Sequence, residues 1–511
     1  MNYAKVELLD VLKDIDFGSS IAELDGLLET ARVETSAFSD LASDKVDLVP
    51  GTKGSGKSAL FRIFVEFLPQ AFLRQHRVVI AHGVKKAGDS VFHAFRAEFE
   101  QLNEDDFQDF WCIYVVSLVN EQFLKDPLYE AYLRDCAPEI ELFKLSCQQA
   151  RIPEVKAARS LMEVLQSVLY ALSRMKPKLT FRPPGDAGEF GLTLFGVPEE
   201  KKAVKTDDGV AVLPVYMDQI RTSLEQLLKK AGLSIWIMID KLDEIFPRRS
   251  LLERTALRGL LRTLRIFTSD TIRLKLFLRD DMLGAIVSGG EGFAALTHIV
   301  ARQADTLRWS EDQILTMVVN RLFWSEKLCK YVAIDPRRLE ASLQYRTDAF
   351  YRVFPPTVHK GSRQSPTMSW LYNHTADANG VVTPRDVIDL LTRAKQHQQG
   401  LLTADSEGFQ DTIISAQAIL YGHNELSNHK RTTYLEAEFP HLWPYMKRFI
   451  DGKSDYSPQA IRSLLGREWQ DVVVDLRSIG FISVKGRKEA EVYSIPHVYR
   501  RGLQITQGTE T

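Results

Sequence analysis

Eight residues in the first part of the chain have the types and spacing of a phosphate-binding loop. Residues 51–58 read Gly-Thr-Lys-Gly-Ser-Gly-Lys-Ser, the pattern G-x-x-x-x-G-K-S. Glycines let backbone N–H groups turn inward around phosphate oxygens, and a following helix N-terminus adds partial positive charge. In this pattern Lys57 reaches the β- and γ-phosphates and the Ser58 hydroxyl is a ligand of Mg²⁺. The residues expected to hold the phosphates are Gly51, Thr52, Lys53, Gly54, Ser55, Gly56, Lys57 and Ser58.

The sequence on either side of this loop matches the strand and the helix that the pattern requires. Residues 46–50 read as a buried strand, and residues 59–68 are almost wholly apolar and read as a buried helix. A plain glycine-rich surface turn is the alternative interpretation, but it requires neither flank. The residues therefore favour a phosphate loop.

Acidic residues further along the chain have positions that suit metal-assisted phosphate chemistry. Asp240 ends the most apolar strand-like run, 233–240, and a carboxylate there can hold Mg²⁺ opposite Ser58, directly or through water. Hydrolysis also needs a carboxylate that positions the attacking water; Asp243 and Glu244 are the candidates, and Glu244 is favoured. The structural alternative is that these acids only cap the following helix.

Arginines are expected to meet the charge that develops on a γ-phosphate. Arg279 follows the strand-like run 272–278 and should emerge at the same sheet edge as Asp240, while Arg385 starts a helix from which it can reach the nucleotide. Four more arginines recur at helical spacing and would line one face of a helix. This face could be solvated and salt-bridged, a subunit interface or a polyanion contact. The four arginines are Arg254, Arg258, Arg262 and Arg265.

Length and composition bound the class of protein. A chain of 511 residues is too long for one ordinary core, and its net charge of −2 gives no global basic field for nucleic acid. The four cysteines form no C-x-x-C pair, so we expect reduced, mostly buried thiols rather than a zinc site or disulfides. No apolar run is long enough to span a membrane and the N-terminus lacks a signal-peptide pattern, so we expect a cytoplasmic protein.

Strand-like and helical runs alternate, which predicts an α/β fold with a parallel sheet between helices. Besides the runs already named, residues 77–82 read as a strand and residues 304–309 as a further one. Right-handed crossovers then place the phosphate loop at the carboxyl ends of the strands. Residues 91–230 form an insertion, mostly helical, with a hairpin near 178–197 and a charged segment at 199–208.

The C-terminal half has two further patterns. Residues 311–425 are largely helical, and Thr383 and Pro384 give a helix start there, as N-cap and first-turn residue. Within 441–511, two helix-like runs (457–465 and 468–478) precede two strand-like runs (481–484 and 492–495) around a basic tip, Lys485 to Lys488. Helix, turn, helix, hairpin is the element order of a winged helix.

These motifs together resemble a known family. The phosphate loop, Ile239-Asp-Lys-Leu-Asp-Glu244, Phe277-Leu-Arg-Asp280, Thr383-Pro-Arg-Asp386 and the terminal helix–hairpin pattern are similar to those of bacterial P-loop ATPases of the AAA+/STAND group, and to the origin-recognition type of ATPase. The resemblance implies Mg·ATP binding, slow hydrolysis, sensor roles for Arg279 and Arg385, and a homo-oligomer assembled through the ATPase face. It also implies a phage-defence or mobile-element setting beside an effector protein.

The resemblance implies an α/β fold with a parallel-sheet P-loop NTPase core, a large helical insertion, a helical lid and a C-terminal winged-helix domain. The predicted boundaries are 1–45 for an N-terminal helical segment, 46–310 for the core with its 91–230 insertion, 311–425 for the lid and 441–511 for the winged helix. One position departs from the family, because Lys241 stands where related ATPases keep a glutamate after the metal aspartate.

Three functions remain open from the sequence. The first is an ATP-driven, oligomerising switch that controls a partner protein, and the second is a DNA-binding ATPase of initiator or loader type. Residues 441–511 hold 11 Lys and Arg against 8 Asp and Glu, and the presumed recognition helix carries Glu468, Asp471 and Asp475, which are unfavourable next to DNA phosphates. The third is an ATP-binding scaffold without hydrolysis, which the Lys241 departure allows.

Overall fold

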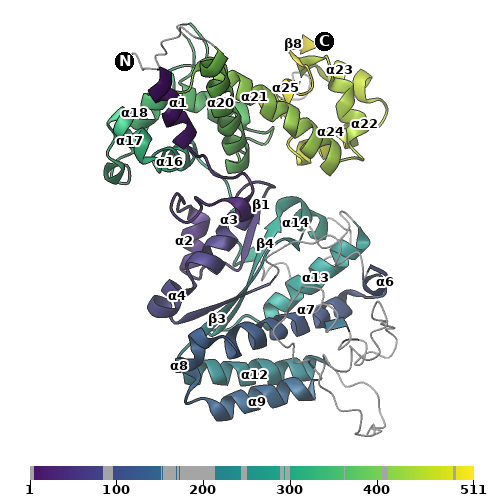
Figure 1. The fold of residues 1–511 in the computed structure, drawn as a ribbon. Helices are drawn as coiled ribbons and strands as arrows, with labels where there is room; N and C mark the ends of the chain where they lie inside the picture. The colour runs from purple at the N-terminus through teal and green to yellow at the C-terminus, as the bar shows by residue number, and fades with distance from the viewer. Residues whose placement is uncertain are drawn as a thin grey trace, which may run out of the picture. The chain divides into compact units, whose positions relative to one another are not determined.

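The computed structural model of the chain forms two compact units (Figure 1). We call them the C-terminal unit, Met1–Ser36 with Thr52–Ala59 and Leu307–Thr511, and the sheet unit, Ala37–Gly51 with Leu60–Thr306. The structure describes residues 5–83, 96–150, 152, 168–169, 172, 213–242, 250–287, 293, 300–361, 363–404, 412–486 and 491–510.

A parallel sheet of four strands, in the order β1-β4-β3-β2, organises the sheet unit. Its strands are β1 (Leu48–Gly51), β2 (Val78–His82), β3 (Ser234–Ile239) and β4 (Ile272–Arg279). Gly51 pairs with Arg279 and Ile239 pairs with Leu276, so β1, β4 and β3 end at one edge of the sheet. The α/β fold with a parallel P-loop core is thereby confirmed, and these four strands lie where the sequence predicted them.

Strand β3 is apolar on both faces because each face packs against helices. On one face, the Trp236 ring lies 5.3 Å from the ring of Phe72 and 6.4 Å from that of Phe64. On the other face, Ile235, Ile237 and Ile239 belong to the core that the helices of the insertion also enter. A strand without a polar face is what a central parallel strand requires.

The described part of the insertion is helical. Helix α7 (Glu104–Val119) packs closely on α13 (Leu251–Ile266), and a Cβ added at Gly259 would lie only 2.7 Å from Cβ of Phe107. The Trp111 indole also donates to the Ala256 carbonyl at 2.9 Å. Helix α3 (Lys57–Arg62) begins in the C-terminal unit and ends in the sheet unit. The other described helical elements of the sheet unit are α2 (Ser36–Ala42), η2 (Ile63–Phe67), α4 (Pro69–His76), α6 (Arg96–Phe99), η3 (Asn120–Leu124), η4 (Pro127–Tyr129), α8 (Glu130–Leu133), α9 (Ala137–Gln149), α12 (Leu213–Ala231) and α14 (Asp280–Val287). The predicted hairpin near 178–197 and the charged segment 199–208 lie outside the described residues.

The strand predicted at 304–309 is wrong. Leu48 forms one isolated bridge with Gln303, and the Ala304 amide donates to the Leu48 carbonyl at 2.8 Å, but no ladder follows. Ala304 and Leu307, whose apolar character suggested a strand, are buried by packing rather than by pairing in the sheet. The segment leaves β1 after this single bridge and its flanking hydrogen bonds.

Two of the four helically spaced arginines are paired inside the sheet unit. Arg258 Nε lies 2.9 Å from a Glu104 oxygen, and Arg262 Nη1 lies 2.6 Å from Asp105 and 3.3 Å from Glu104. The salt-bridged interpretation therefore holds for these two, although Arg258 is buried rather than solvated. Their charges are met by the first turn of α7.

A buried charge network anchors the start of β1. Lys275, which is fully buried on β4, donates to Asp44 at 2.7 Å, to Asp47 at 3.2 Å and to the Val46 carbonyl at 2.8 Å. Arg302 donates to Asp47 and to the Asp44 carbonyl, each at 2.5 Å. A buried lysine needs such partners, and its partners here lie directly ahead of β1 and of the phosphate loop.

The C-terminal unit is mainly helical. Its helices are α1 (Lys5–Asp14), η1 (Ala22–Leu24), α16 (Glu311–Leu322), α17 (Glu326–Val332), η6 (Pro336–Arg338), α18 (Leu343–Val353), α19 (Thr367–Thr375), α20 (Pro384–Ala404), α21 (Ala416–Lys430), η7 (Arg431–Glu436), α22 (Trp443–Met446), η8 (Lys447–Phe449), α23 (Pro458–Leu465), α24 (Trp469–Ser478) and α25 (His497–Arg500). The predicted start of α20 is confirmed, because the Thr383 hydroxyl accepts from the Asp386 amide at 3.2 Å. Helices α20 and α21 lie side by side (Figure 1).

The last 60 residues add a small mixed sheet in the order β6-β7-β5-β8. Helices α23 and α24 and the antiparallel pair β6 (Ser483–Lys485) and β7 (Val492–Ser494) follow the predicted element order. Strands β5 (Lys453–Tyr456) and β8 (Thr506–Glu510) were not predicted. The name winged helix stays a prediction, and residues 487–490 of its tip lie outside the described residues.

All four cysteines, Cys112, Cys136, Cys147 and Cys329, are buried free thiols, as predicted. Burial raises the pKa of the Cys147 thiol to about 12, which makes it a poor nucleophile. Across the described residues, no helix combines the length and the apolar character that crossing a membrane requires.

Candidate functional site

The phosphate loop has backbone angles that its glycines make accessible. It follows β1 directly, and Lys57 and Ser58 open helix α3. Gly54 has φ +83° and Gly56 has φ +103°, both in the region where a side chain is strained. At Gly54, an added Cβ would also lie 3.2 Å from Cβ of Arg385. These two positions therefore require glycine for conformation, and Gly54 requires it for space as well.

The loop curls around the side chain of Lys57. The ammonium group donates to the Thr52 carbonyl at 2.8 Å, across the loop from its own backbone, and Lys57 is 8% exposed. Among the described residues, the buried hydroxyls of Thr52 and Ser55 have no hydrogen-bond partner. A lysine held across the loop and unsatisfied hydroxyl donors fit an anionic ligand such as a nucleotide phosphate.

Trp309 contacts the outer side of the loop. Its indole N–H donates to the Ser55 carbonyl at 2.7 Å, and a Cβ added at Gly56 would lie 3.6 Å from the same ring. The backbone carbonyl of Trp309 accepts a hydrogen bond from the Tyr372 hydroxyl of α19 at 2.9 Å. The loop is thus tied to the helices of its own unit.

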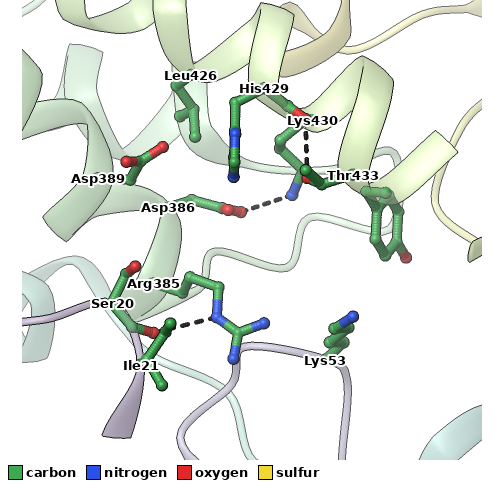
Figure 2. A pocket seen from close by; sticks show the side chains of 11 residues that line it. Ser20, Ile21, Lys53, Arg385, Asp386, Asp389, Leu426, His429, Lys430 and Thr433 are labelled. Carbon is green, nitrogen blue, oxygen red and sulfur yellow. Dashed lines mark hydrogen bonds and ion pairs between the residues drawn. The ribbon is translucent and has the colours of Figure 1, made fainter. Parts of the chain in front are cut away.

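Arg385 lies beside the loop, at the start of α20. Its Nε donates to the Ser20 carbonyl at 3.2 Å, and in the described part of the chain no other partner is found for its guanidinium group. A pocket of about 370 Å³ opens here, lined by Arg385 and by Lys53 of the loop (Figure 2). Figure 2 shows the Arg385 guanidinium pointing between Ser20 and Lys53. A cation with unused donors next to the loop suits a negatively charged ligand.

The other charges around this pocket are largely paired. Asp386, the residue after Arg385, accepts from Lys430 of α21 at 2.7 Å (Figure 2). Lys53 forms an ion pair with Glu438, and Asp389 pairs with Arg393 at 3.0 Å. The ammonium group of Lys430 also lies 5.0 Å from the centre of the Tyr434 ring. These pairs connect α20, α21 and η7 around the pocket.

The sheet edge of the sheet unit carries the other candidate residues. Asp240 follows β3 and is 2% exposed. Lys241 has φ +60°, an unusual conformation for a residue other than glycine, which turns the chain sharply after Asp240. Arg279 ends β4, as predicted, and forms a two-point ion pair with Asp281, at 2.9 Å from Nε and 2.8 Å from Nη2. Asp281 therefore sets the direction of the Arg279 guanidinium.

The structure groups the predicted residues into two sets. The C-terminal unit brings Arg385 to residues 52–58, and the sheet unit brings Arg279 and Asp240 to the edge at which β1 ends. Asp243 and Glu244 lie outside the described residues. That Ser58 and Asp240 share one Mg²⁺ stays a prediction, as do the catalytic roles of the carboxylates.

Sequence reasoning missed Trp309, Asp281 and the Lys53–Glu438 pair. Trp309 and Ser55 are 254 positions apart, and no local pattern reports such a contact. Asp281 had a signal that was not used, since an acid two positions after a strand-end arginine can pair with it. Glu438 had none.

Comparison with known proteins gives few matches. No protein-family model matches the sequence, and no curated protein matches it. Among solved structures, the chain is similar to the Aeropyrum pernix ORC2 protein in its ADPNP–ADP complexes, with 12% identity, a TM-score of 0.38, and coverage of 92% of this chain and 93% of that one. For the ADP form of ORC2 the identity is 11% and the TM-score 0.32, with 93% and 94% covered.

Proposed function

We propose that the protein is a Mg²⁺-dependent ATPase that acts as an ATP-driven oligomerising switch and controls a partner protein. The observation that carries the proposal is the phosphate loop with its ammonium and arginine side chains. Residues 52–56 curl around the side chain of Lys57, and Arg385 lies beside Gly54 with N–H donors that have no partner among the described residues. A triphosphate offers several negative oxygens to these groups and to the loop amides.

Each residue has a distinct part in this proposal. The loop amides and Lys57 bind the β- and γ-phosphates, and Arg385 and Arg279 stabilise the charge that develops on the γ-phosphate. Ser58 and Asp240 would hold Mg²⁺, which neutralises phosphate charge when bound. Glu244 or Asp243 orients the attacking water.

The contacts of α20 support a switch rather than a simple hydrolase. Arg385 faces the phosphate loop, while the next residue, Asp386, holds Lys430 on α21. A γ-phosphate that attracts Arg385 therefore pulls on the helix that is ion-paired to α21. Gain and loss of this phosphate would bias the arrangement of the C-terminal helices, and with it the surface offered to other molecules.

The exposed face of α24 favours a protein partner over DNA. That face carries Asp471 and Asp475 beside Val474, which is 64% exposed. Two carboxylates repel phosphates, whereas an exposed apolar side chain suits a protein contact. Arg500, at the end of α25, donates to the Ile495 carbonyl at 2.7 Å rather than facing a ligand alone. The initiator or loader function is kept as an outcome of the test.

Mass measurement by light scattering tests the switch. We expect the parent protein to form a larger species with Mg·ATP than without it, and the Lys57→Ala variant to keep one mass in both conditions. Lys330→Ala is the matched control, because Lys330 is 80% exposed and pairs only loosely with Glu326, at 3.6 Å.

The mass measurement repeated with linear DNA, together with an assay of ATP turnover, separates the alternatives. A parent mass that is unchanged by Mg·ATP would contradict the switch. A further increase only with linear DNA would favour the initiator or loader function. ATP binding without turnover would favour the non-hydrolysing scaffold. The phage-defence setting implied by the resemblance forms no part of this experiment.

A further inference from the structure

We infer that Trp309 is a positioning residue for phosphate binding: its indole N–H holds the Ser55–Gly56 peptide so that the Gly56 N–H faces into the loop. The inference rests on the proposed function, since it concerns how the same loop binds a nucleotide. It assigns a role to a residue outside the loop pattern. It also gives a physical reason for the chain to carry tryptophan, rather than another aromatic residue, at this position.

The contacts place Trp309 against one particular peptide group. The distance from Nε1 to the Ser55 carbonyl oxygen is 2.7 Å, a short hydrogen bond. The N–H edge of the indole lies near Gly56, where an added Cβ would be 3.6 Å from Cζ2 and 3.8 Å from Nε1. Ser55 is fully buried, so the bond is made away from bulk water. Both the hydrogen bond and the packing of the indole edge therefore act at the Ser55–Gly56 peptide.

The geometry of the peptide group links this contact to phosphate binding, because it fixes the direction of the Gly56 N–H. In a trans peptide, the carbonyl oxygen and the next N–H point in opposite directions across a planar group. A Ser55 carbonyl held toward Trp309, outside the loop, leaves the Gly56 N–H directed inward. Inward N–H groups are the donors with which such a loop binds phosphate. The φ of +103° at Gly56 requires a residue that can hold this orientation.

Trp309 is itself held in place. The Tyr372 hydroxyl of α19 donates to its backbone carbonyl at 2.9 Å, and the neighbouring Leu307 is buried. The side chain of Leu307 also lies 3.8 Å from the position of a Cβ added at Gly56. An indole that was free to rotate would lose side-chain entropy when it formed the hydrogen bond to Ser55. Because Trp309 is already held in place, this cost is smaller and the hydrogen bond is stronger in net terms. Phenylalanine fills the same space without an N–H, which separates the hydrogen bond from the packing.

The experiment compares Trp309→Phe with the parent by calorimetric titration of Mg·ATP and Mg·ADP. We expect both dissociation constants to rise about five- to tenfold, since the Gly56 amide loses its fixed orientation. We expect Tyr372→Phe to give a smaller rise. Trp324→Phe, at a tryptophan that is 57% exposed, is the control and should bind like the parent. The thermal midpoint of each variant is measured alongside.

A spectroscopic readout distinguishes positioning from simple packing, and once the signal is assigned it does not need the Trp309→Phe protein. With ¹⁵N-labelled indoles the seven tryptophans give seven N–H signals, and Trp309→Phe identifies one by its loss. Phosphate binding at the Gly56 N–H polarises the peptide and makes the Ser55 carbonyl a stronger acceptor. The Trp309 signal should therefore shift downfield with Mg·ADP in the parent, and should not shift in Lys57→Ala. If Trp309→Phe does not fold, stepwise substitution of the other tryptophans assigns the signal.

The outcomes separate this inference from the proposed function. If the parent binds neither Mg·ATP nor Mg·ADP, the proposed function fails and the inference fails with it. If the parent binds and Lys57→Ala does not, two results overturn the inference alone: unchanged affinity in Trp309→Phe, or a Trp309 signal that stays in place at saturating Mg·ADP. Weaker binding together with the shift supports it.

Discussion

Gly54 and Gly56, which the sequence pattern identified, are required in the structure by the backbone conformation of the loop. Both have positive φ, and Gly54 also packs against Arg385 and Thr383. The pattern alone indicated that backbone approaches phosphate at these positions. The structure adds that the space outside Gly54 is occupied by the start of α20, so this glycine also sets how closely the helix approaches the loop.

Replacement of Gly54 by alanine tests this requirement. We predict that Gly54→Ala destabilises the protein by about 1–3 kcal/mol, because an L-residue is strained at this φ and its Cβ meets Arg385. Gly400→Ala is the matched control, since Gly400 lies within helix α20 with no atom near a new Cβ, and it should stabilise by about 0.5–1 kcal/mol. Urea denaturation measures both. Equal effects at the two glycines would show that loop geometry is not the cause.

The two acids after Asp240 give a second prediction at this scale. Glu244→Gln should slow ATP turnover while keeping nucleotide affinity, because the amide cannot act as the base or orient water as a carboxylate does. Asp243→Asn is the matched variant and should retain turnover. Steady-state hydrolysis and titration of Mg·ATP measure the two quantities. If Asp243→Asn alone slows turnover, the roles of the two acids are exchanged.

Residue identity could be predicted where local sequence carries the signal. Lys57, Thr383 and the strand-end Arg279 stand where their neighbours in the sequence indicated. Trp309 could not be predicted, because its partner Ser55 is 254 positions away and the hydrogen bond uses a backbone carbonyl, which has no sequence signature. Residues that act through distant backbone groups need a structure to be found.

Elements with strong apolar periodicity were predictable, and short polar ones were not. Strand β3 has five buried residues in a row, whereas β5 reads Lys-Ser-Asp-Tyr and β8 reads Thr-Gln-Gly-Thr-Glu. Neither short strand alternates apolar and polar residues, so only its pairing in the small sheet identifies it. The strand predicted at 304–309 failed for the opposite reason. Its apolar residues are spaced as in a strand and are buried, but the segment forms no ladder with a partner strand.

Three helices of the C-terminal unit bring histidines together, which predicts acid sensitivity. The ring centres of His374 (α19) and His497 (α25) are 4.1 Å apart, and those of His374 and His423 (α21) are 5.6 Å apart. Burial lowers the pKa of His374 to about 3, and that of His423 and His497 to about 4. Burial is the largest cause of these lowered pKa values; neighbouring histidines contribute to each of them, as do Arg500 for His374 and His497 and Arg501 for His423. At a mildly acidic pH, these three histidines are therefore neutral in the folded protein but protonated in the unfolded chain.

The direction of the pH effect follows from linkage. An unfolded histidine has a pKa near 6.5, so between about pH 6.5 and pH 4 the unfolded chain binds protons that the folded cluster does not. We predict full stability from these groups above about pH 6.5 and a falling urea midpoint as pH drops toward 4. His497→Gln should reduce the slope, and His429→Gln, at an exposed histidine, should leave it unchanged. A midpoint independent of pH in this window would contradict the prediction.

For the whole molecule, the two compact units divide the chain between β1 and the loop that follows it. Residues 52–59 belong to the C-terminal unit, although β1 belongs to the sheet unit. Under the proposed function, phosphates bound by the loop amides would act directly on the unit that contains Arg385, Trp309 and α20. The sequence predicted the phosphate loop and the helical region separately, but not that they form one compact unit, because that depends on contacts far apart in the chain.

Binding of Mg·ATP by residues 51–58 is the claim on which the rest of the account depends. Isothermal titration of Mg·ATP into the parent, Lys57→Ala and Lys330→Ala proteins tests it most directly. We predict one site in the parent and in Lys330→Ala, and no measurable heat of binding in Lys57→Ala with its thermal midpoint preserved. Equal affinity in the parent and in a folded Lys57→Ala protein, or no binding by the parent, would contradict the account.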